Sequence, residues 1–171
     1  GRWFVPVAVK IPGSAVKPGK KGTSRVDFIG QVRTEKGALA QAVRDMIEVK
    51  VTAEQTRPLL YDTGFTLAPG KYRLKMLVRE NGEGKMGTFQ TTFEIPAPPT
   101  DEAALTLSPL VLSYQRVAAK AAIAQADKGA AKLWALHPLV RNGQKLLPSV
   151  TRVFRRDQTL AAYAEAYGPE Q

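Results

Sequence analysis

The residues of this sequence that could perform nucleophilic or acid–base chemistry are few and scattered. The single histidine, His137, stands directly before Pro138 and far from any cluster of carboxylates. A nucleophile, a base and an orienting acid would have to lie within hydrogen-bonding reach of one another, and no such partners are identifiable for His137. We therefore expect His137 to be a packing or surface residue. Cysteine is absent, which excludes disulfides, cysteine-ligated metal and thiol catalysis.

The carboxylates do not form a recognisable metal site. The acidic residues that stand out are Asp62, Asp101, Glu102 and Asp157. None of them belongs to the Asp-x-Asp-x-Asp-Gly pattern of a calcium loop. We expect no metal site, no cofactor and no enzymatic activity.

The segment Asn81-Gly82-Glu83-Gly84 separates two alternating stretches and predicts a hairpin turn. It is not a phosphate-binding loop, because it lacks Gly-Lys-Ser/Thr and does not precede a helix. Glu80 and Glu83 have the residue types of a general acid and base. We interpret them instead as charged residues that keep a hairpin tip in solvent.

Positive charge is the most pronounced feature of the composition. Lysine and arginine total 25 against 15 acidic residues, which gives a formal charge of +10. On one alternating stretch, four cations are expected to share a sheet face: Lys71, Arg73, Lys75 and Arg79. This is our candidate anion-binding face, for a carbohydrate or an anionic polymer. Specific nucleic-acid binding is not expected, because charge alone gives only non-specific attraction.

These cations need strands to position them, and the first half of the chain predicts strands throughout. Apolar and polar residues alternate with period two, which is typical of half-buried strands. Pro6 favours an edge position for the first of them. The predicted strands span residues 2–11, 26–33, 43–51, 59–67, 71–79 and 88–95.

The turn before the fifth strand carries the most specific signal. Leu67-Ala68-Pro69-Gly70-Lys71-Tyr72-Arg73-Leu74 has the form Leu-x-Pro-Gly-x-Tyr-x-Leu. In immunoglobulin and fibronectin type III sandwiches, a tyrosine at this corner bonds its hydroxyl to nearby backbone. The pattern predicts a tyrosine corner at Tyr72. We also predict a buried core, made of Phe28, Ile47, Val49, Tyr72, Leu74, Met76, Phe89 and Phe93.

The remainder predicts a linker and a second β-module. Prolines between residues 96 and 100 stiffen the chain. A strand is expected at 105–112, a short helix within 116–132, and strands at 144–154 and 160–167. We therefore divide the chain into a sandwich at 1–97, a linker at 98–132 and the start of a second module at 133–171, truncated at the chain end.

Three stretches stand out as a group: residues 61–65 together with 67–72, residues 78–89 and residues 138–151. They resemble the region that follows the von Willebrand factor A domain in secreted proteins of acidobacteria-type bacteria. The resemblance implies a secreted or cell-envelope, multidomain protein. The sequence itself contains no signal peptide and no apolar stretch of about 18 residues that would span a bilayer, so an export signal would lie upstream. The metal-ion-dependent adhesion motif Asp-x-Ser-x-Ser is absent, so no metal residue is carried over.

Taken together, the sequence predicts an all-β protein: an immunoglobulin or fibronectin III-like sandwich, a linker and a partial second β-module. The expected function is a non-catalytic structural or protein-interaction module of a larger exported bacterial protein, whose partner is a neighbouring domain or another protein. The alternative is an anionic-polymer or carbohydrate-binding module that uses the basic face.

Overall fold

A computed structural model describes residues 2–19, 22–52, 57–97, 105–119 and 137–167. The chain divides into two compact units, Gly1–Ala97 and Pro98–Gln171. The strands of the first unit are β1 (Trp3–Ile11), β2 (Thr23–Thr34), β3 (Leu39–Lys50), β4 (Leu59–Leu67), β5 (Gly70–Glu80) and β6 (Met86–Ile95). A short 3-10 helix, η1 (Gly13–Ala15), follows β1.

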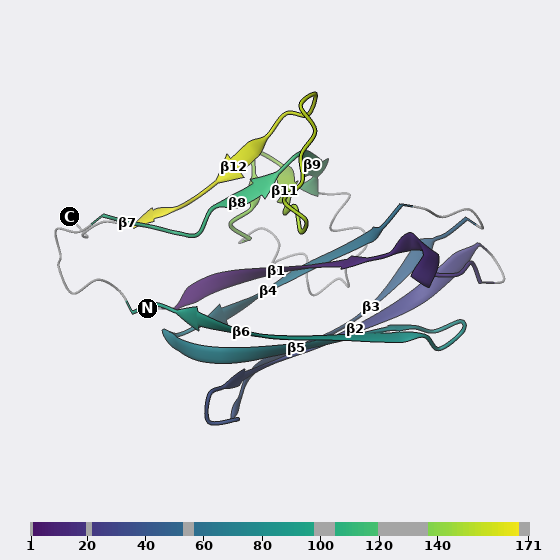
Figure 1. Ribbon diagram of the computed structural model, residues 1–171, viewed down its shortest axis with the longest axis horizontal. Helices are drawn as coiled ribbons and strands as arrows, with labels where there is room; N and C mark the ends of the chain where they lie inside the picture. The colour runs from purple at the N-terminus through teal and green to yellow at the C-terminus, as the bar shows by residue number, and fades with distance from the viewer. Residues whose placement is uncertain (1, 20–21, 53–56, 98–104, 120–136, 168–171) are drawn as a thin grey trace. The chain divides into compact units, whose positions relative to one another are not determined.

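The first unit is a sandwich of two antiparallel sheets. One sheet has the strand order β3-β2-β5-β6, and the other pairs β1 with β4. Figure 1 shows the β1–β4 layer above the four-stranded layer. In immunoglobulin nomenclature β1 and β4 take the places of strands B and E, and the larger sheet those of C′, C, F and G. The predicted all-β sandwich is confirmed.

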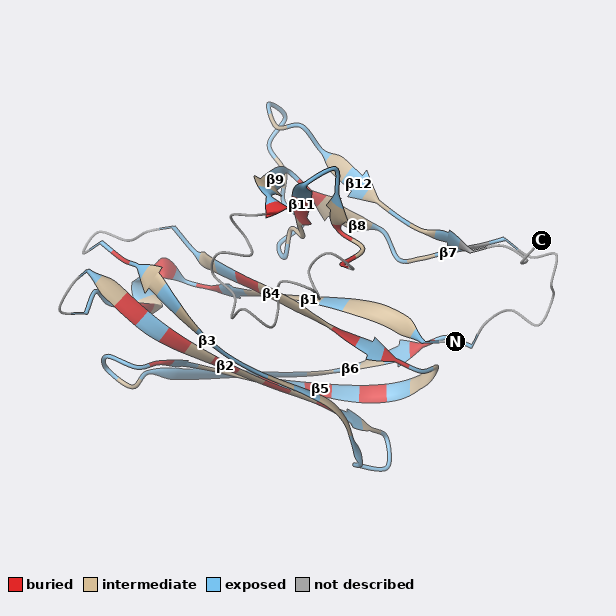
Figure 2. Cartoon of the chain, turned by 180° about the vertical axis from the view of Figure 1, so that it is seen from behind, coloured by how far each residue is buried: buried red, intermediate tan, exposed pale blue. Residues whose placement is uncertain are grey.

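The core lies between these sheets because the strands alternate in burial. On β5, Tyr72, Leu74 and Met76 are buried while the residues between them are exposed. On β2, Val26 and Phe28 are fully buried. The same alternation appears as coloured bands along β2 and β5 in Figure 2. Phe28 stacks on Tyr61 of β4 with ring centroids 3.8 Å apart, which joins the two sheets.

The predicted core is wrong at Phe89, which is 62% exposed. Phe89 lies directly opposite Met76 and so on the core side of the sheet. Ile47, Val49 and Phe93 are half-buried rather than buried. All four residues belong to β3 or β6, the outer strands of the larger sheet. Two facing strands do not cover the width of four, so the inner face of an outer strand stays partly open.

The described part of the second unit contains short strands. β9 (Gln115–Ala118), β10 (Val140–Arg141) and β11 (Gln144–Leu147) form a three-stranded sheet in the order β10-β11-β9. Asn142 and Gly143 form the turn between β10 and β11, with φ of 51° and 72°. The other strands form two pairs, β8 (Val111–Ser113) with β12 (Ala161–Tyr163), and β7 (Thr106–Leu107) with β13 (Ala166–Tyr167).

Three predictions for the second half need correction. Residues 115–118 form strand β9 instead of the start of a helix, because they pair with β11; residues 120–132 lie outside the described residues. The strand expected at 144–154 ends at Leu147, where Pro148 removes the next backbone donor. The strand expected at 105–112 is likewise interrupted between β7 and β8, where Pro109 lies. Within the described ranges, no helix has the length and apolar character to span a membrane.

Candidate functional site: a basic sheet face

The four cations predicted to share a face do so. Lys71, Arg73, Lys75 and Arg79 are all exposed on β5 and alternate with the buried residues of that strand. Their side chains therefore leave the sheet on the side opposite the core. This outer face of the sheet β3-β2-β5-β6 is called the basic face below.

Neighbouring strands add cations that the sequence prediction missed. By register, Arg33 lies directly opposite Arg73, and Arg25, Arg44 and Lys50 occupy further outward positions on β2 and β3. The face carries eight cations against three acidic residues, Asp27, Glu48 and Glu94. Only the register between strands shows that these charges share one face. The pattern of a single strand indicates that Arg33 points outward, but it does not indicate that Arg33 lies opposite Arg73.

Each acidic residue of this face lies next to a cation. Glu48 forms an ion pair with Arg25 at 3.5 Å, Asp27 lies opposite Arg79, and Glu94 lies opposite Lys71. Cross-strand neighbours of opposite charge offset one another locally. The formal excess of positive charge is thus concentrated away from these three positions.

The concentration is highest at Arg33, Arg73 and Lys75, which we call the basic centre. The residue opposite Arg73 on β6 is Thr92, and Lys75 lies between Gln31 and Gln90. No acidic residue occupies a directly opposite position. Arg33 is held in place, because its guanidinium donates to the Gly37 carbonyl at 2.9 Å and to Gln31 Oε1 at 3.2 Å.

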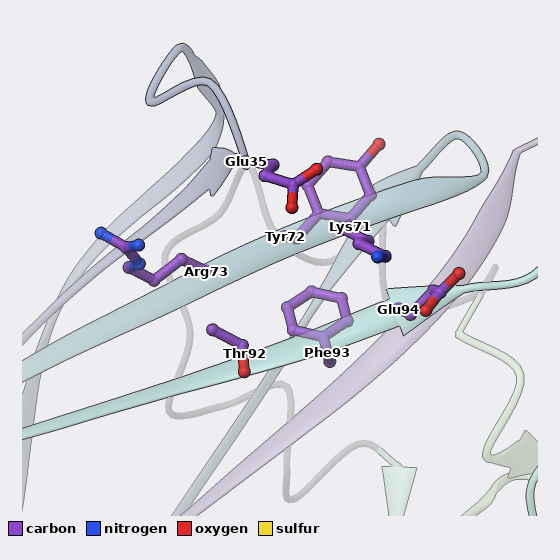
Figure 3. Close-up of a pocket in the computed structure, with 7 residues that line it drawn as sticks. All are labelled: Glu35, Lys71, Tyr72, Arg73, Thr92, Phe93 and Glu94. Carbon is purple, nitrogen blue, oxygen red and sulfur yellow. The ribbon is translucent and has the colours of Figure 1, made fainter.

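A hollow of about 440 Å³ adjoins the basic centre. Its lining comes from Glu35, the first residue after β2, and from β5 and β6, and Figure 3 labels all seven residues. Tyr72 and Phe93 stack at its base with centroids 5.7 Å apart. Glu35 and Glu94 share the hollow with Lys71 and Arg73, and in Figure 3 Arg73 extends away from both carboxylates. The hollow is therefore close to neutral, whereas the basic centre beside it is not.

Tyr72 fixes strand β5, which carries four cations of the basic face. Its hydroxyl donates to the carbonyl of Ala68 at 2.9 Å, across the turn that leads into β5. Gly70 in this turn has φ of 147°, a conformation that side-chain-bearing residues rarely adopt. This is the geometry of a tyrosine corner, and it sets the position at which Lys71 and Arg73 emerge.

Glu80 is not the solvated residue that we predicted, whereas Glu83 is exposed at the hairpin tip as expected. Glu80 is buried, and its carboxylate accepts hydrogen bonds from the amides of Gly82 and Glu83, at 2.6 and 2.7 Å, and from the Ser24 hydroxyl at 2.8 Å. Burial raises the pKa of Glu80, but these bonds, with the charge of Lys85, outweigh it and lower that pKa overall. Glu83 pairs with Lys85 at 2.6 Å. The Glu80 carboxylate thus holds the β5–β6 hairpin closed.

The remaining chemistry-bearing residues are dispersed. His137 is buried in the second unit, and its Nδ1 accepts the amide of Leu139 at 3.1 Å. Asp62 lies on β4 in the first unit. Asp157 lies in the second unit, where it pairs with Arg155 at 3.1 Å. Asp101 and Glu102 lie outside the described residues. In the part of the chain that the structure describes, no three histidine or acidic residues gather to hold a metal ion.

Comparisons with protein-family models, curated proteins and solved structures find no match to this chain.

Proposed function

We propose that this chain is a non-catalytic interaction module, and that the basic face binds an anionic partner. The basic centre carries this proposal: Arg33 and Arg73 are directly opposite each other, with Lys75 two residues along β5. Like charges in directly opposite positions destabilise a sheet. An anionic partner would remove that repulsion on binding.

The spacing of the basic centre defines the chemistry of the partner. Neighbouring strands are about 4.8 Å apart, and successive outward positions on one strand are about 6.6 Å apart. Arginine forms paired hydrogen bonds with carboxylates, sulfates and phosphates. A partner with anionic groups repeated every 5–7 Å or so, such as a sulfated or carboxylated polymer, would meet these requirements.

A structural or protein-interaction role is the second candidate, and the tyrosine corner favours it. The corner and the Glu80-capped hairpin make β5 and β6 a rigid element on which a neighbouring domain could rest. We also propose, from the resemblance to von Willebrand factor A-related proteins, that the module belongs to a larger exported bacterial protein. The sequence encoded upstream tests that setting: a signal peptide and an A-type domain are expected there.

Retention on heparin-agarose tests the anion-binding proposal. The parent chain should require more salt for elution than the triple variant Arg33→Gln, Arg73→Gln, Lys75→Gln. A matched control, Arg152→Gln, Arg155→Gln, Arg156→Gln, removes the same charge from the second unit and should elute like the parent. If both variants elute together, the basic centre is not the binding site. Circular dichroism establishes that each variant remains folded.

A further inference from the structure

The outer edge of strand β1 is a second candidate binding surface of the sandwich. Among the described residues, β1 pairs with a strand along one edge only, the edge that faces β4. Pro6 has no amide hydrogen, so it fits a position whose nitrogen points away from the β1–β4 ladder. Along an antiparallel strand, the backbone amide and carbonyl groups of successive residues point alternately to one edge and to the other. The amides of Ala8 and Lys10, two and four residues on, therefore point to the same outer edge as Pro6.

The position beyond this edge lies over an exposed aromatic residue. Tyr61 of β4 stacks on Phe28 of β2 and donates a hydrogen bond to Asp45 of β3. β4 thus faces the β2–β3 side of the larger sheet, and β1 lies toward β5 and β6. A further strand beside β1 would face β6. There Phe89 lies on the core side of the sheet and is 62% exposed.

We propose that an extended segment of another polypeptide pairs with the outer edge of β1 and covers Phe89. It would take the place of strand A, the one that lies beside strand B in immunoglobulin sandwiches. Main-chain hydrogen bonds to β1 supply the pairing, and alternate side chains enter the gap between the sheets. The inward side chains are apolar, because they meet Phe89 and the half-buried Val5 and Val7.

Charge further defines the occupant. The charged residues at this strand are Arg2 and Lys10, which are both exposed and both cationic. The expected segment therefore alternates apolar residues with polar ones and is acidic at its ends. Pro6 lowers the number of donors at this edge by one but leaves its carbonyl available. An occupying strand needs no acceptor opposite Pro6.

A synthetic peptide tests the proposal on the full chain. The probe has nine residues to match the length of β1, with valine at alternate positions, threonine between them and aspartate at both ends. The control peptide has the same side chains but N-methylated amides along one edge. Binding is followed by amide hydrogen exchange. We expect exchange at Ala8 and Lys10 to slow with the probe and to remain unchanged with the control peptide.

Two substitutions on β6 distinguish specific binding at this site from non-specific binding of the probe. Phe89→Ser should weaken the binding of the probe about tenfold, which corresponds to the loss of one buried aromatic contact. Met86→Ser is the matched control, because Met86 is 67% exposed on the opposite face of the same strand; its affinity should equal that of the parent. The variant Arg73→Gln, Lys75→Gln should also bind like the parent, which separates this surface from the basic face.

Three results would overturn the proposal. The first is a failure of either readout: the probe binds the parent and Phe89→Ser with equal affinity, or amide exchange at Ala8 and Lys10 does not slow at millimolar probe. The second is protection of both amides in the chain alone, in a sample that sedimentation shows to be monomeric. The third is self-association through β1, seen as a dimer whose formation protects the same amides, which would make a second copy the occupant.

Discussion

The hydroxyl of Tyr61 on β4 donates a hydrogen bond to the carboxylate of Asp45 on β3 and so ties the two sheets together. Tyr61 is buried and stacked on Phe28, whereas Asp45 stands at an outer strand in contact with solvent. Asp45 points inward by register, opposite Phe28. The tie holds the smaller sheet over β2 and β3, which leaves the β5–β6 side of the core less covered.

Tyr61→Phe tests this tie through its pH dependence. Burial, followed by the bond to Asp45 and the charge of Asp45, raises the pKa of Tyr61. Because the folded pKa exceeds the unfolded value of about 10, the hydroxyl stabilises the fold below pH 10, and this stabilisation is lost as the pH rises further. At pH 8, Tyr61→Phe should cost about 1 kcal/mol. Between pH 9 and 11 the parent should lose more stability than the variant. Urea midpoints for both proteins check this; curves that stay parallel would contradict it.

Tyr72→Phe tests the tyrosine corner. Removal of the bond to the Ala68 carbonyl should lower the free energy of unfolding by about 1 kcal/mol, because the ring packing with Phe93 is retained. Tyr114→Phe, at a tyrosine that is 40% exposed, is the control and should leave stability unchanged. Equal urea midpoints for Tyr72→Phe and the parent would show that the corner contributes no stability.

Glu80→Gln should weaken the β5–β6 hairpin and remove an acid-sensitive contribution. The pKa of Glu80 is lowered in the fold. Its ionised form therefore stabilises the fold above the unfolded value near pH 4.3, and that stabilisation is lost as the pH falls through the lower folded pKa. We expect the gap in urea midpoint between parent and variant to be widest at neutral pH and to narrow below pH 4. Glu83→Gln, on the exposed ion pair, should show little gap at any pH.

The sequence predicted what depends on a single strand. Alternation placed Lys71, Arg73 and Lys75 on one face, and the Leu-x-Pro-Gly-x-Tyr-x-Leu pattern located the turn at Tyr72. It did not predict what depends on how strands meet. Arg33 joins the basic centre only because β2 and β5 pair in one particular register. Phe89 has the pattern of a core residue, and its exposure follows from the width of the opposite sheet.

Glu80 at the β5–β6 hairpin shows a further reason why a prediction from the sequence can be wrong. The sequence predicts a solvated Glu80, because acidic residues at turns are usually solvated. Its burial follows from the Ser24 hydroxyl on β2 and the two turn amides that converge on it. No local pattern marks that convergence, since Ser24 lies 56 residues earlier in the chain.

The basic centre should cost stability. Arg73→Gln removes the repulsion between Arg73 and Arg33, so it should stabilise the chain by a few tenths of a kcal/mol at low salt. The gain should shrink as added salt screens the exposed charges, over about 10 Å at 0.1 M. Thermal unfolding at 10 mM and 500 mM salt measures both effects. Lys71→Gln is the comparison, since Lys71 lies opposite Glu94 and its removal should give no gain.

The salt dependence of polyanion binding tests the central claim most directly. The logarithm of the affinity for a fluorescent heparin oligosaccharide, plotted against the logarithm of the salt concentration, reports how many cations engage the probe. The variant Arg33→Gln, Arg73→Gln, Lys75→Gln should show a slope smaller by roughly three than the parent. The matched variant Arg25→Gln, Lys71→Gln, Arg79→Gln removes the same charge from positions that face carboxylates and should keep most of the parent slope. Equal slopes for the two variants, or an affinity of the parent no greater than theirs, would contradict an anion-binding role for the basic centre.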